Sequence, residues 1–302
     1  MHVIVITGAT GSGKTDLAIE VASRLKCEII SADSRQLYRD IPIGTAAPTP
    51  EQLERVPHHM VGILGLEEYY SAARFEEDVL ALIGQMEQRG LTHVVLCGGA
   101  MMYVDAVTRG LDDLPTISDE VRASTLELYE QGGLEALRSE LSRLDPDYLA
   151  VADPNNHRRL IHALEIIRQS GRPFSQLRTG VRRERPFAVS KYALELPRDV
   201  LFDRINRRVD AMMEAGLEAE ARRVYPLRRL NSLNTVGYKE MFAWFDGTMD
   251  RETAIARMQK NTRVYAKKQL TWLRRDPDVK WVSPDAALAV IMADLAALDQ
   301  AD

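Results

Sequence analysis

Residues 8–15 have the types and spacing of a loop that binds phosphate. GATGSGKT matches the pattern GxxxxGK[ST], and it stands between the β-rich run VIVIT and an amphipathic stretch from Lys14 to Leu25. Backbone N–H groups of such a loop surround phosphate oxygens, while Lys14 adds a cation and Thr15 can bind Mg²⁺. The predicted phosphate-binding residues are Gly8, Ala9, Thr10, Gly11, Ser12, Gly13, Lys14 and Thr15. The motif does not select between ATP, GTP and any other diphosphate ester, and an ordinary glycine turn is the structural alternative.

A carboxylate follows the second predicted strand, EIIS at 28–31. Asp33 lies just past the carboxyl end of that strand, at the edge where open parallel sheets bind ligands. It could act as a general base, as a helix N-cap or near Mg²⁺. Ser34, Arg35 and Gln36 add a hydroxyl, a guanidinium and an amide, which are groups that recognise bases or phosphates, although a surface loop can contain them as well.

The remaining pattern predicts an α/β fold of P-loop type with an all-helical insertion. Further elements are predicted as a helix at about 71–89 and strands at 92–97 and 188–196. Strands that alternate with helices imply a parallel sheet. Between 114 and 186 the β-rich runs disappear, and from Arg198 the chain is mostly helical, with a long basic helix from about Asp250 to Arg275. The predicted domains are a core of 1–113 and 187–302 and an insertion at 114–186.

Composition restricts the class of protein. The 302 residues are 45% hydrophobic and 27% charged, which is typical of a globular protein, and no apolar run reaches the roughly 18 residues of a membrane span. The start MHVIVITG lacks the basic region and cleavage site of a signal peptide, so we expect a cytoplasmic protein without a membrane association. We also expect a monomer. Cys27 and Cys97 lack CxxC spacing and are predicted to be buried free thiols. His58 and His59 have no neighbouring carboxylate or cysteine to complete a metal site.

Charge is distributed unequally along the chain. Residues 1–150 hold 12 basic and 24 acidic side chains, whereas residues 151–302 hold 27 and 20. Eight arginines stand between 158 and 185 against Glu165 and Glu184. The second half is therefore suited to a polyanion, and a solvated helix face is the alternative for that stretch.

These motifs together resemble the bacterial tRNA dimethylallyltransferase (tRNA isopentenyltransferase) family over nearly the whole chain. A phosphate loop alone is common to many enzymes. The combination is more specific, because it includes DSRQLY, VPHHM, RRLIHALE, VGYKE and AKKQLTW.

The resemblance implies transfer of the dimethylallyl group from dimethylallyl diphosphate to N6 of the adenosine at position 37 of tRNA, with Mg²⁺. The loop would hold the leaving diphosphate. Asp33 matches the general base, Arg208 matches an arginine at the diphosphate, and Arg204 is a weaker candidate.

The resemblance also implies an extruded adenine and contacts to the anticodon stem-loop. The segment from Gly98 to Tyr103 is expected to form an apolar wall of the base and prenyl channel. Trp272 and Trp281 are interpreted as core residues. The implied tRNA-binding residues are Asp33, Ser34, Arg35, Gln36, Met101, Arg158, Arg159, Leu160, Ile161, His162, Gly237, Tyr238, Lys239, Arg263, Lys267 and Lys268.

Three positions depart from the family pattern. Ala100 and Ala47 replace a common threonine and lysine, and His162 replaces an arginine. Each change affects one expected contact. The competing hypotheses are an adenylate isopentenyltransferase that prenylates free AMP, ADP or ATP, a P-loop nucleotide kinase or NTP-hydrolysing switch, and a tRNA-binding module without catalysis.

Overall fold

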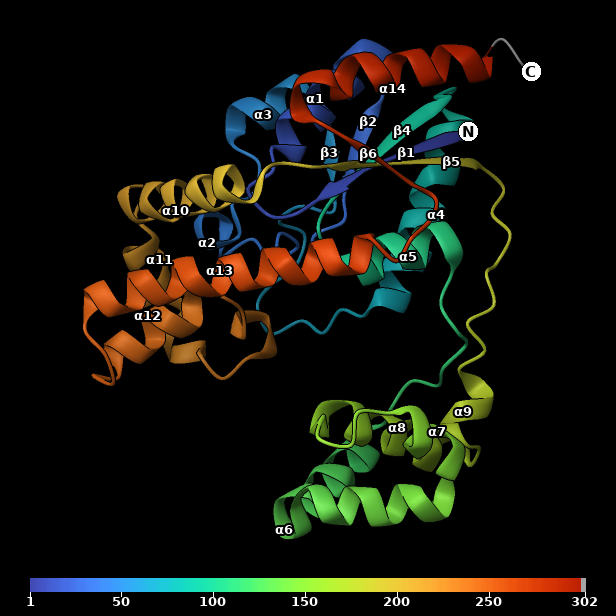
Figure 1. Ribbon diagram of the computed structural model, residues 1–302, viewed down its shortest axis with the longest axis vertical. Coiled ribbons are helices and arrows are strands. Elements are labelled where there is room, and N and C mark those ends of the chain that lie inside the picture. Colours follow the sequence, from blue (N-terminus) through green and yellow to red (C-terminus); the bar gives the residue numbers. More distant parts are fainter. Residues whose placement is uncertain (300–302) are drawn as a thin grey trace. The chain divides into compact units, whose positions relative to one another are not determined.

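The computed structural model describes residues 1–299. Its sheet has six strands, all parallel, in the order β3-β2-β4-β1-β5-β6 (Figure 1). The strands are β1 (His2–Gly8), β2 (Glu28–Ser31), β3 (His58–His59), β4 (His93–Cys97), β5 (Ala188–Leu194) and β6 (Val279–Val282). Parallel strands require crossover connections, and the helices between them supply these. The parallel sheet with flanking helices confirms the predicted α/β fold of P-loop type.

Both faces of the sheet are buried, as the strand periodicity requires. In β1, Val3 and Val5 contribute to one hydrophobic cluster, and Ile4 and Ile6 contribute to the other. The helices α1 (Lys14–Leu25) and α14 (Pro284–Asp299) cover the Ile4 face. The opposite face packs on α4 (Ala72–Gln88), α5 (Met101–Arg109) and helices of the C-terminal part. This explains why strands of the core are almost continuously apolar.

The C-terminal part places a helical layer beside the strand ends (Figure 1). Its helices are α10 (Arg198–Glu214), α11 (Leu217–Val224), α12 (Tyr238–Phe245) and α13 (Arg251–Leu273), with 3₁₀ turns η1 (Tyr225–Leu227) and η2 (Asn231–Leu233). Two short helices, α2 (Pro42–Thr45) and α3 (Pro50–Arg55), lie between β2 and β3.

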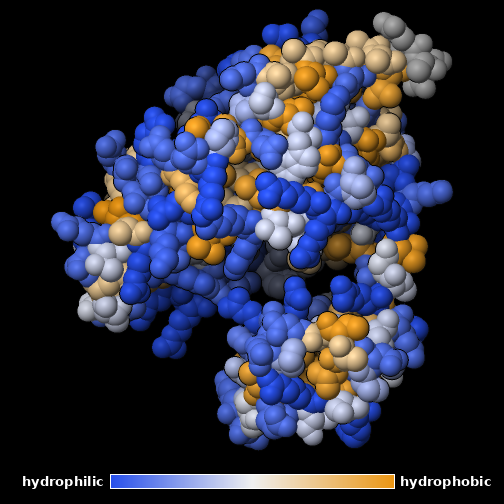
Figure 2. Space-filling model, viewed as in Figure 1, coloured by the Kyte–Doolittle hydropathy of each residue, from blue (hydrophilic) through white to orange (hydrophobic). Residues whose placement is uncertain are grey.

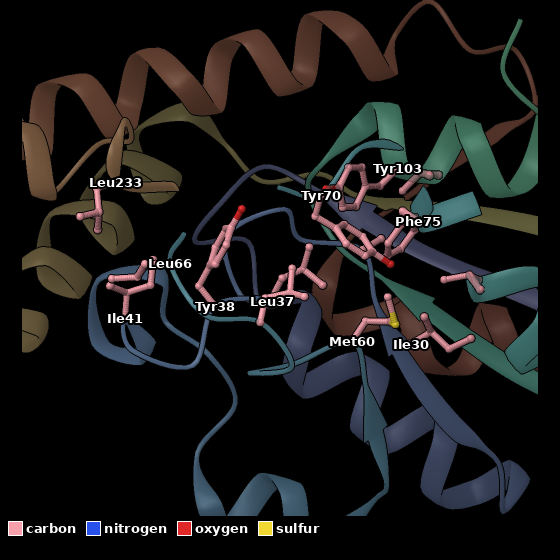
Figure 3. Packing of buried hydrophobic residues seen from close by; sticks show 14 of the residues in the cluster. Ile30, Leu37, Tyr38, Ile41, Met60, Leu66, Tyr70, Phe75, Tyr103 and Leu233 are labelled. Carbon is pink, nitrogen blue, oxygen red and sulfur yellow. The ribbon is translucent and has the colours of Figure 1, made fainter. Parts of the chain in front are cut away.

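Ile41 and Leu233 belong to the same hydrophobic cluster as Ile30, so the segment after β2 is anchored to this layer (Figure 3).

The second compact unit is Gly110–Glu184, and the first comprises Met1–Arg109 and the chain from Arg185. The predicted insertion, 114–186, begins and ends slightly later. The unit contains α6 (Asp119–Leu144), α7 (Pro146–Val151), α8 (His157–Ser170) and α9 (Phe174–Leu177). It has its own core, which includes Leu137, Leu141, Leu160 and Leu164. An independent core lets this unit fold as a body of its own.

Most predicted elements are confirmed within a residue or two, including the helix at 14–25 and the strand at 28–31. The sequence missed β3 and β6, because two- and four-residue strands carry little periodicity. Cys27 and Cys97 are buried free thiols, as predicted. Trp272 is 43% exposed and donates its indole N–H to Asp105, so its assignment to the core was wrong. Among residues 1–299, the helices are too short or too polar to cross a membrane.

Candidate active site

The glycine-rich loop between β1 and α1 adopts a conformation that only its glycines permit. Gly11 and Gly13 have φ of 82° and 97°, in the left-handed region that L side chains rarely adopt. Gly13 is the N-cap residue of α1 and offers no side chain to the helix end. The first backbone N–H groups of α1 are therefore available to an anion.

Two polar side chains in this loop, Ser12 and Lys14, differ in their hydrogen bonding. The Ser12 hydroxyl is shielded from solvent, and within residues 1–299 it has no hydrogen-bond partner. Lys14 Nζ donates to the carbonyl of Ala9 at 2.8 Å. Burial, reinforced by the Arg208 charge and opposed by Cys97 and Asp33, lowers the pKa of Lys14 to about 8. A diphosphate bound beside Lys14 would favour the charged form of the lysine.

One pocket brings the loop and α1 together with residues from six other parts of the first unit. Lys14 and Thr15 begin α1, Asp33 follows β2, and Arg208 comes from the middle of α10. The other lining residues are Thr10, Ala18, Ile29, Ser31, Gln36, Thr45, Pro48, His58, Cys97, Gly98, Gly99, Tyr265 and Gln269. The pocket thus combines cations, one carboxylate and an apolar section, which is the composition expected for a phosphate ester with a small hydrocarbon or base.

Asp33 and Arg208 face the same pocket with opposite charges. Asp33 Oδ1 accepts hydrogen bonds from the backbone N–H groups of Arg35 and Gln36, at 2.8 and 3.3 Å. Residues 34–37 form a turn and no helix begins there, so Asp33 is not a helix N-cap; the two bonds close the turn and fix the carboxylate at the pocket. Burial lowers the pKa of Arg208, and the Asp33 charge opposes this shift. Arg204, one turn earlier, donates to the Ser12 carbonyl at 3.5 Å.

The residues after Asp33 are held by the protein itself. Arg35 Nη1 donates to the carbonyls of Asn231 and Ser232 at 3.0 and 3.2 Å. Gln36 Nε2 donates to the carbonyls of Thr45 and Ala46. Both side chains therefore anchor loops in this structure. Ser34 precedes both residues, directly after Asp33, and is partly exposed.

Gln269 of α13 lines the pocket, although the sequence did not predict it there. Its Oε1 accepts from the backbone N–H of Thr10 at 2.8 Å, and its Nε2 donates to the carbonyl of Gly99 at 3.0 Å. A Cβ on Gly99 would lie 2.4 Å from that Nε2, so a larger residue here would displace the Gln269 amide. Gln269 was visible in the AKKQLTW motif, but its partners come from two distant loops.

Tyr265 is a second missed residue on the same helix. It lines the pocket and is 45% exposed. Burial of the hydroxyl, with the Asp33 charge, raises the pKa of Tyr265 to about 12. The phenol is therefore a neutral donor at ordinary pH.

The expected channel wall from Gly98 to Tyr103 is corrected by the structure. Gly98 and Gly99 line the pocket, but Tyr103 is buried and stacks on Phe75 with ring centroids 4.2 Å apart (Figure 3). Met101 packs on the cluster that contains Leu273. Helix α5 begins at Met101 and turns Tyr103 into the core, whereas Met102 is 58% exposed.

Helix α8 of the second unit divides its predicted tRNA-binding residues between two faces. Arg158, Arg159 and His162 are exposed. Leu160 is fully buried in the core of the unit, and Ile161 packs partly against it. The prediction that the Leu160 side chain contacts tRNA was therefore wrong, because the helical period turns this side chain into the core of the unit.

The VGYKE motif is divided in the same way. Gly237 and Tyr238 are buried, and Lys239 is exposed. The prediction that the Tyr238 side chain contacts RNA was also wrong, because the side chain has no exposed surface.

Three basic residues of α13 were predicted to contact tRNA. Arg263 and Lys267 share a face, as predicted, and both lie over the ring of Phe202, at 5.8 and 5.4 Å. Lys268 is also exposed. In Figure 2, hydrophilic residues make up most of the viewed face along α13.

Two arginines of the basic stretch 158–185 are engaged in ion pairs. Arg168 binds Glu140 with Nη2 and Oε2 2.8 Å apart. Arg185 forms a buried pair with Glu76 of the first unit's core, with Nη2 and Oε1 2.6 Å apart. The polyanion-binding hypothesis therefore does not extend to Arg185.

The fold and the pocket define a P-loop enzyme that handles a phosphate ester beside a carboxylate. The chain belongs to the IPP transferase family, whose sequence model matches residues 36–276. It is 51% identical over 287 residues to tRNA dimethylallyltransferase 2 of Parabacteroides distasonis, with 95% of this chain and 96% of the relative covered. It is 53% identical to tRNA dimethylallyltransferase 1 of Phocaeicola vulgatus, with 93% and 94% covered.

Solved structures agree with the sequence relatives. The tRNA isopentenylpyrophosphate transferase of Bacillus halodurans is 37% identical and has a TM-score of 0.72, with 98% of this chain and 96% of that chain covered. A eukaryotic dimethylallyltransferase described as acting on tRNA is 27% identical and has a TM-score of 0.78, with 94% and 75% covered.

Proposed function

We propose that this protein transfers the dimethylallyl group from dimethylallyl diphosphate to N6 of adenosine 37 in tRNA. The observation that carries the proposal is the single pocket in which Lys14, Asp33 and Arg208 meet. The tRNA dimethylallyltransferase relatives support tRNA as the acceptor in preference to a free adenine nucleotide. An enzyme that acts on tRNA would work in the cytoplasm, and we propose a monomer.

The chemistry follows from the charges in the pocket. As the new C–N bond forms, the bond between the allyl carbon and the diphosphate oxygen breaks, and the diphosphate takes the electron pair. The loop N–H groups, Lys14 and Arg208 would stabilise this developing charge. The exocyclic amine is a weak nucleophile, because its lone pair is delocalised into the ring. Asp33 would accept its proton as the bond forms.

Thr15 fits Mg²⁺ as one protein ligand among substrate oxygens. It lines the pocket next to Lys14, and Mg²⁺ commonly binds few protein ligands together with substrate phosphates and water. Within the described residues, no group of three His, Cys, Asp or Glu side chains could hold a metal. When bound there, the ion would supply further neutralisation of the leaving diphosphate.

The acceptor contacts would come from exposed basic side chains. Arg158 and Arg159 on α8, and Lys239, Lys267 and Lys268 in the C-terminal helices, offer charge to the anticodon stem-loop. His162 on α8 offers a neutral imidazole, because burial and the Arg122 charge lower its pKa.

The test is transfer of labelled dimethylallyl from its diphosphate, with Mg²⁺, to unmodified tRNA with adenosine at position 37. The expected result is label on this tRNA and none on the matched tRNA with guanosine there. Label on AMP would instead identify an adenylate isopentenyltransferase. The absence of label from every acceptor, with ATP turnover, would favour a nucleotide kinase.

A further inference from the structure

A short segment between β2 and α3 forms part of the pocket wall and is held from outside. Thr45 and Pro48 line the pocket, and the helix α2 just before Pro48 has only four residues. A helix this short is not stable alone. Its conformation must therefore be fixed by contacts to the rest of the protein.

A buried carboxylate from α11 supplies one set of these contacts. Glu220 accepts hydrogen bonds from the backbone N–H groups of Ile43 and Gly44, at 2.9 and 2.8 Å. It also accepts a short bond from the hydroxyl of Tyr238. Glu220 is 2% exposed and Tyr238 is fully buried. Three donors thus satisfy one carboxylate at the start of α2.

The fit between Tyr238 and α2 is close. A Cβ on Gly44 would lie 2.4 Å from the Tyr238 hydroxyl oxygen, so only glycine permits this approach. The Tyr238 hydroxyl also lies 3.4 Å from the carbonyl of Ile41. The ring of Tyr238 therefore sets the position of α2 relative to α11 and α12.

The other end of the segment is attached next to Asp33. Gln36 Nε2 donates to the carbonyls of Thr45 and Ala46, at 3.3 and 3.0 Å. The Ser31 hydroxyl donates to Gln36 Oε1 at 3.0 Å. Hydrogen bonds at both ends thus give Thr45 one location in the pocket wall.

The lining of the pocket separates by chemistry. Lys14 and Arg208 suit the diphosphate, whereas Ala18, Ile29 and Pro48 are apolar. A five-carbon allyl group would be stabilised in the pocket only where apolar side chains exclude water from it. Pro48 belongs to the segment Ile41–Pro48, which Glu220, Tyr238 and Gln36 hold in place. These contacts, called the brace below, therefore set the position of one side of the apolar section.

We propose that Tyr238 and Glu220 are positioning residues for the prenyl donor. They hold Ile41–Pro48 so that Thr45 and Pro48 enclose the dimethylallyl group, while the loop at residues 8–15 holds the diphosphate. This proposal rests on the proposed function for its donor. It gives the tyrosine of VGYKE a role in donor binding, separate from the exposed Lys239 beside it.

The experiment compares the affinities of inorganic diphosphate and dimethylallyl diphosphate by calorimetry. Tyr238→Phe removes the hydroxyl and keeps the ring. Its affinity for dimethylallyl diphosphate should fall on the order of tenfold, with unchanged affinity for inorganic diphosphate. In turnover, KM for the donor should rise and KM for tRNA should stay unchanged. The matched control is Tyr225→Phe, which removes a tyrosine–carboxylate bond to Asp246 away from the pocket.

The wild-type measurements separate this proposal from the proposed function. If wild-type protein binds both diphosphates equally well, the donor assignment itself fails. If wild type prefers the prenyl donor and Tyr238→Phe keeps that preference, the positioning role is overturned. A higher KM for tRNA alone would also overturn it, in favour of a contact with RNA.

A second variant tests the same brace without deleting the hydroxyl. Gly44→Ala should displace α2 from Tyr238 and reproduce the selective loss of affinity for the prenyl donor. Thermal unfolding establishes whether each variant is folded. If both variants unfold, Tyr238 and Glu220 stabilise the protein as a whole, and the positioning role is overturned.

Discussion

The pocket and helix α8 use positive charge in opposite ways. Lys14 and Arg208 are partly buried in the pocket, and burial lowers the pKa of both. Arg158 and Arg159 are exposed on α8. A buried cation acts at short range through a low dielectric, whereas an exposed cation attracts a polyanion and is screened by salt. Under the proposed function, the first region would carry the reaction and the second the association with tRNA. Substitutions in the two regions should therefore have separable effects on turnover and on tRNA affinity.

The largest expected effect is on the chemical step. Asp33→Ala should lower kcat by about 10² or more with little change in tRNA affinity, because a general base acts mainly in the transition state. Single-turnover transfer and tRNA binding measure the two quantities separately. Near-normal turnover would exclude Asp33 as the base.

A second prediction tests whether all arginines of the stretch 158–185 have the same role. Arg185→Ala removes one charged partner of the buried Glu76, and breaking such a buried pair should cost about 3–5 kcal/mol of unfolding free energy. Denaturant unfolding measures this loss. Unchanged stability would contradict the assignment of Arg185 to the core, and Arg158→Ala is the exposed control from the same stretch.

A third prediction concerns association. The double variant Arg158→Ala and Arg159→Ala should weaken tRNA binding about tenfold at low salt and make its salt dependence shallower, because fewer counterions are released. Affinity for dimethylallyl diphosphate should stay unchanged. Titrations at two salt concentrations measure both. An unaltered salt slope would remove α8 from the tRNA-binding surface.

The smallest effect is a pH dependence of diphosphate binding. Lys14 has a pKa of about 8, so in the unliganded protein it loses its charge as the pH rises through that value. The affinity advantage of wild type over Lys14→Ala should be full below pH 7 and should decrease several-fold by pH 9. Taking the ratio removes the titration of diphosphate itself. A ratio that is constant over this range would contradict the lowered pKa.

The local pattern of the sequence was enough for the elements that carry the site. The loop at 8–15, the strand at 28–31 and the long helix of AKKQLTW each have a signal within a few consecutive residues. Glycines, apolar runs and helical periodicity act over that range, so these elements could be predicted from the chain alone. The short strand β6 carries no such signal and was missed.

Tertiary structure alone decided which side chain of a motif faces the substrate and which holds the protein together. Tyr238 and Lys239 are neighbours in sequence, yet one is buried against α2 and the other is exposed. Gln269 joins Thr10 to Gly99 across more than 150 residues of chain. The sequence determined the fold class, the phosphate loop and the family, because these depend on local spacing. The direction of each side chain was decided by packing between distant segments, which no local pattern records.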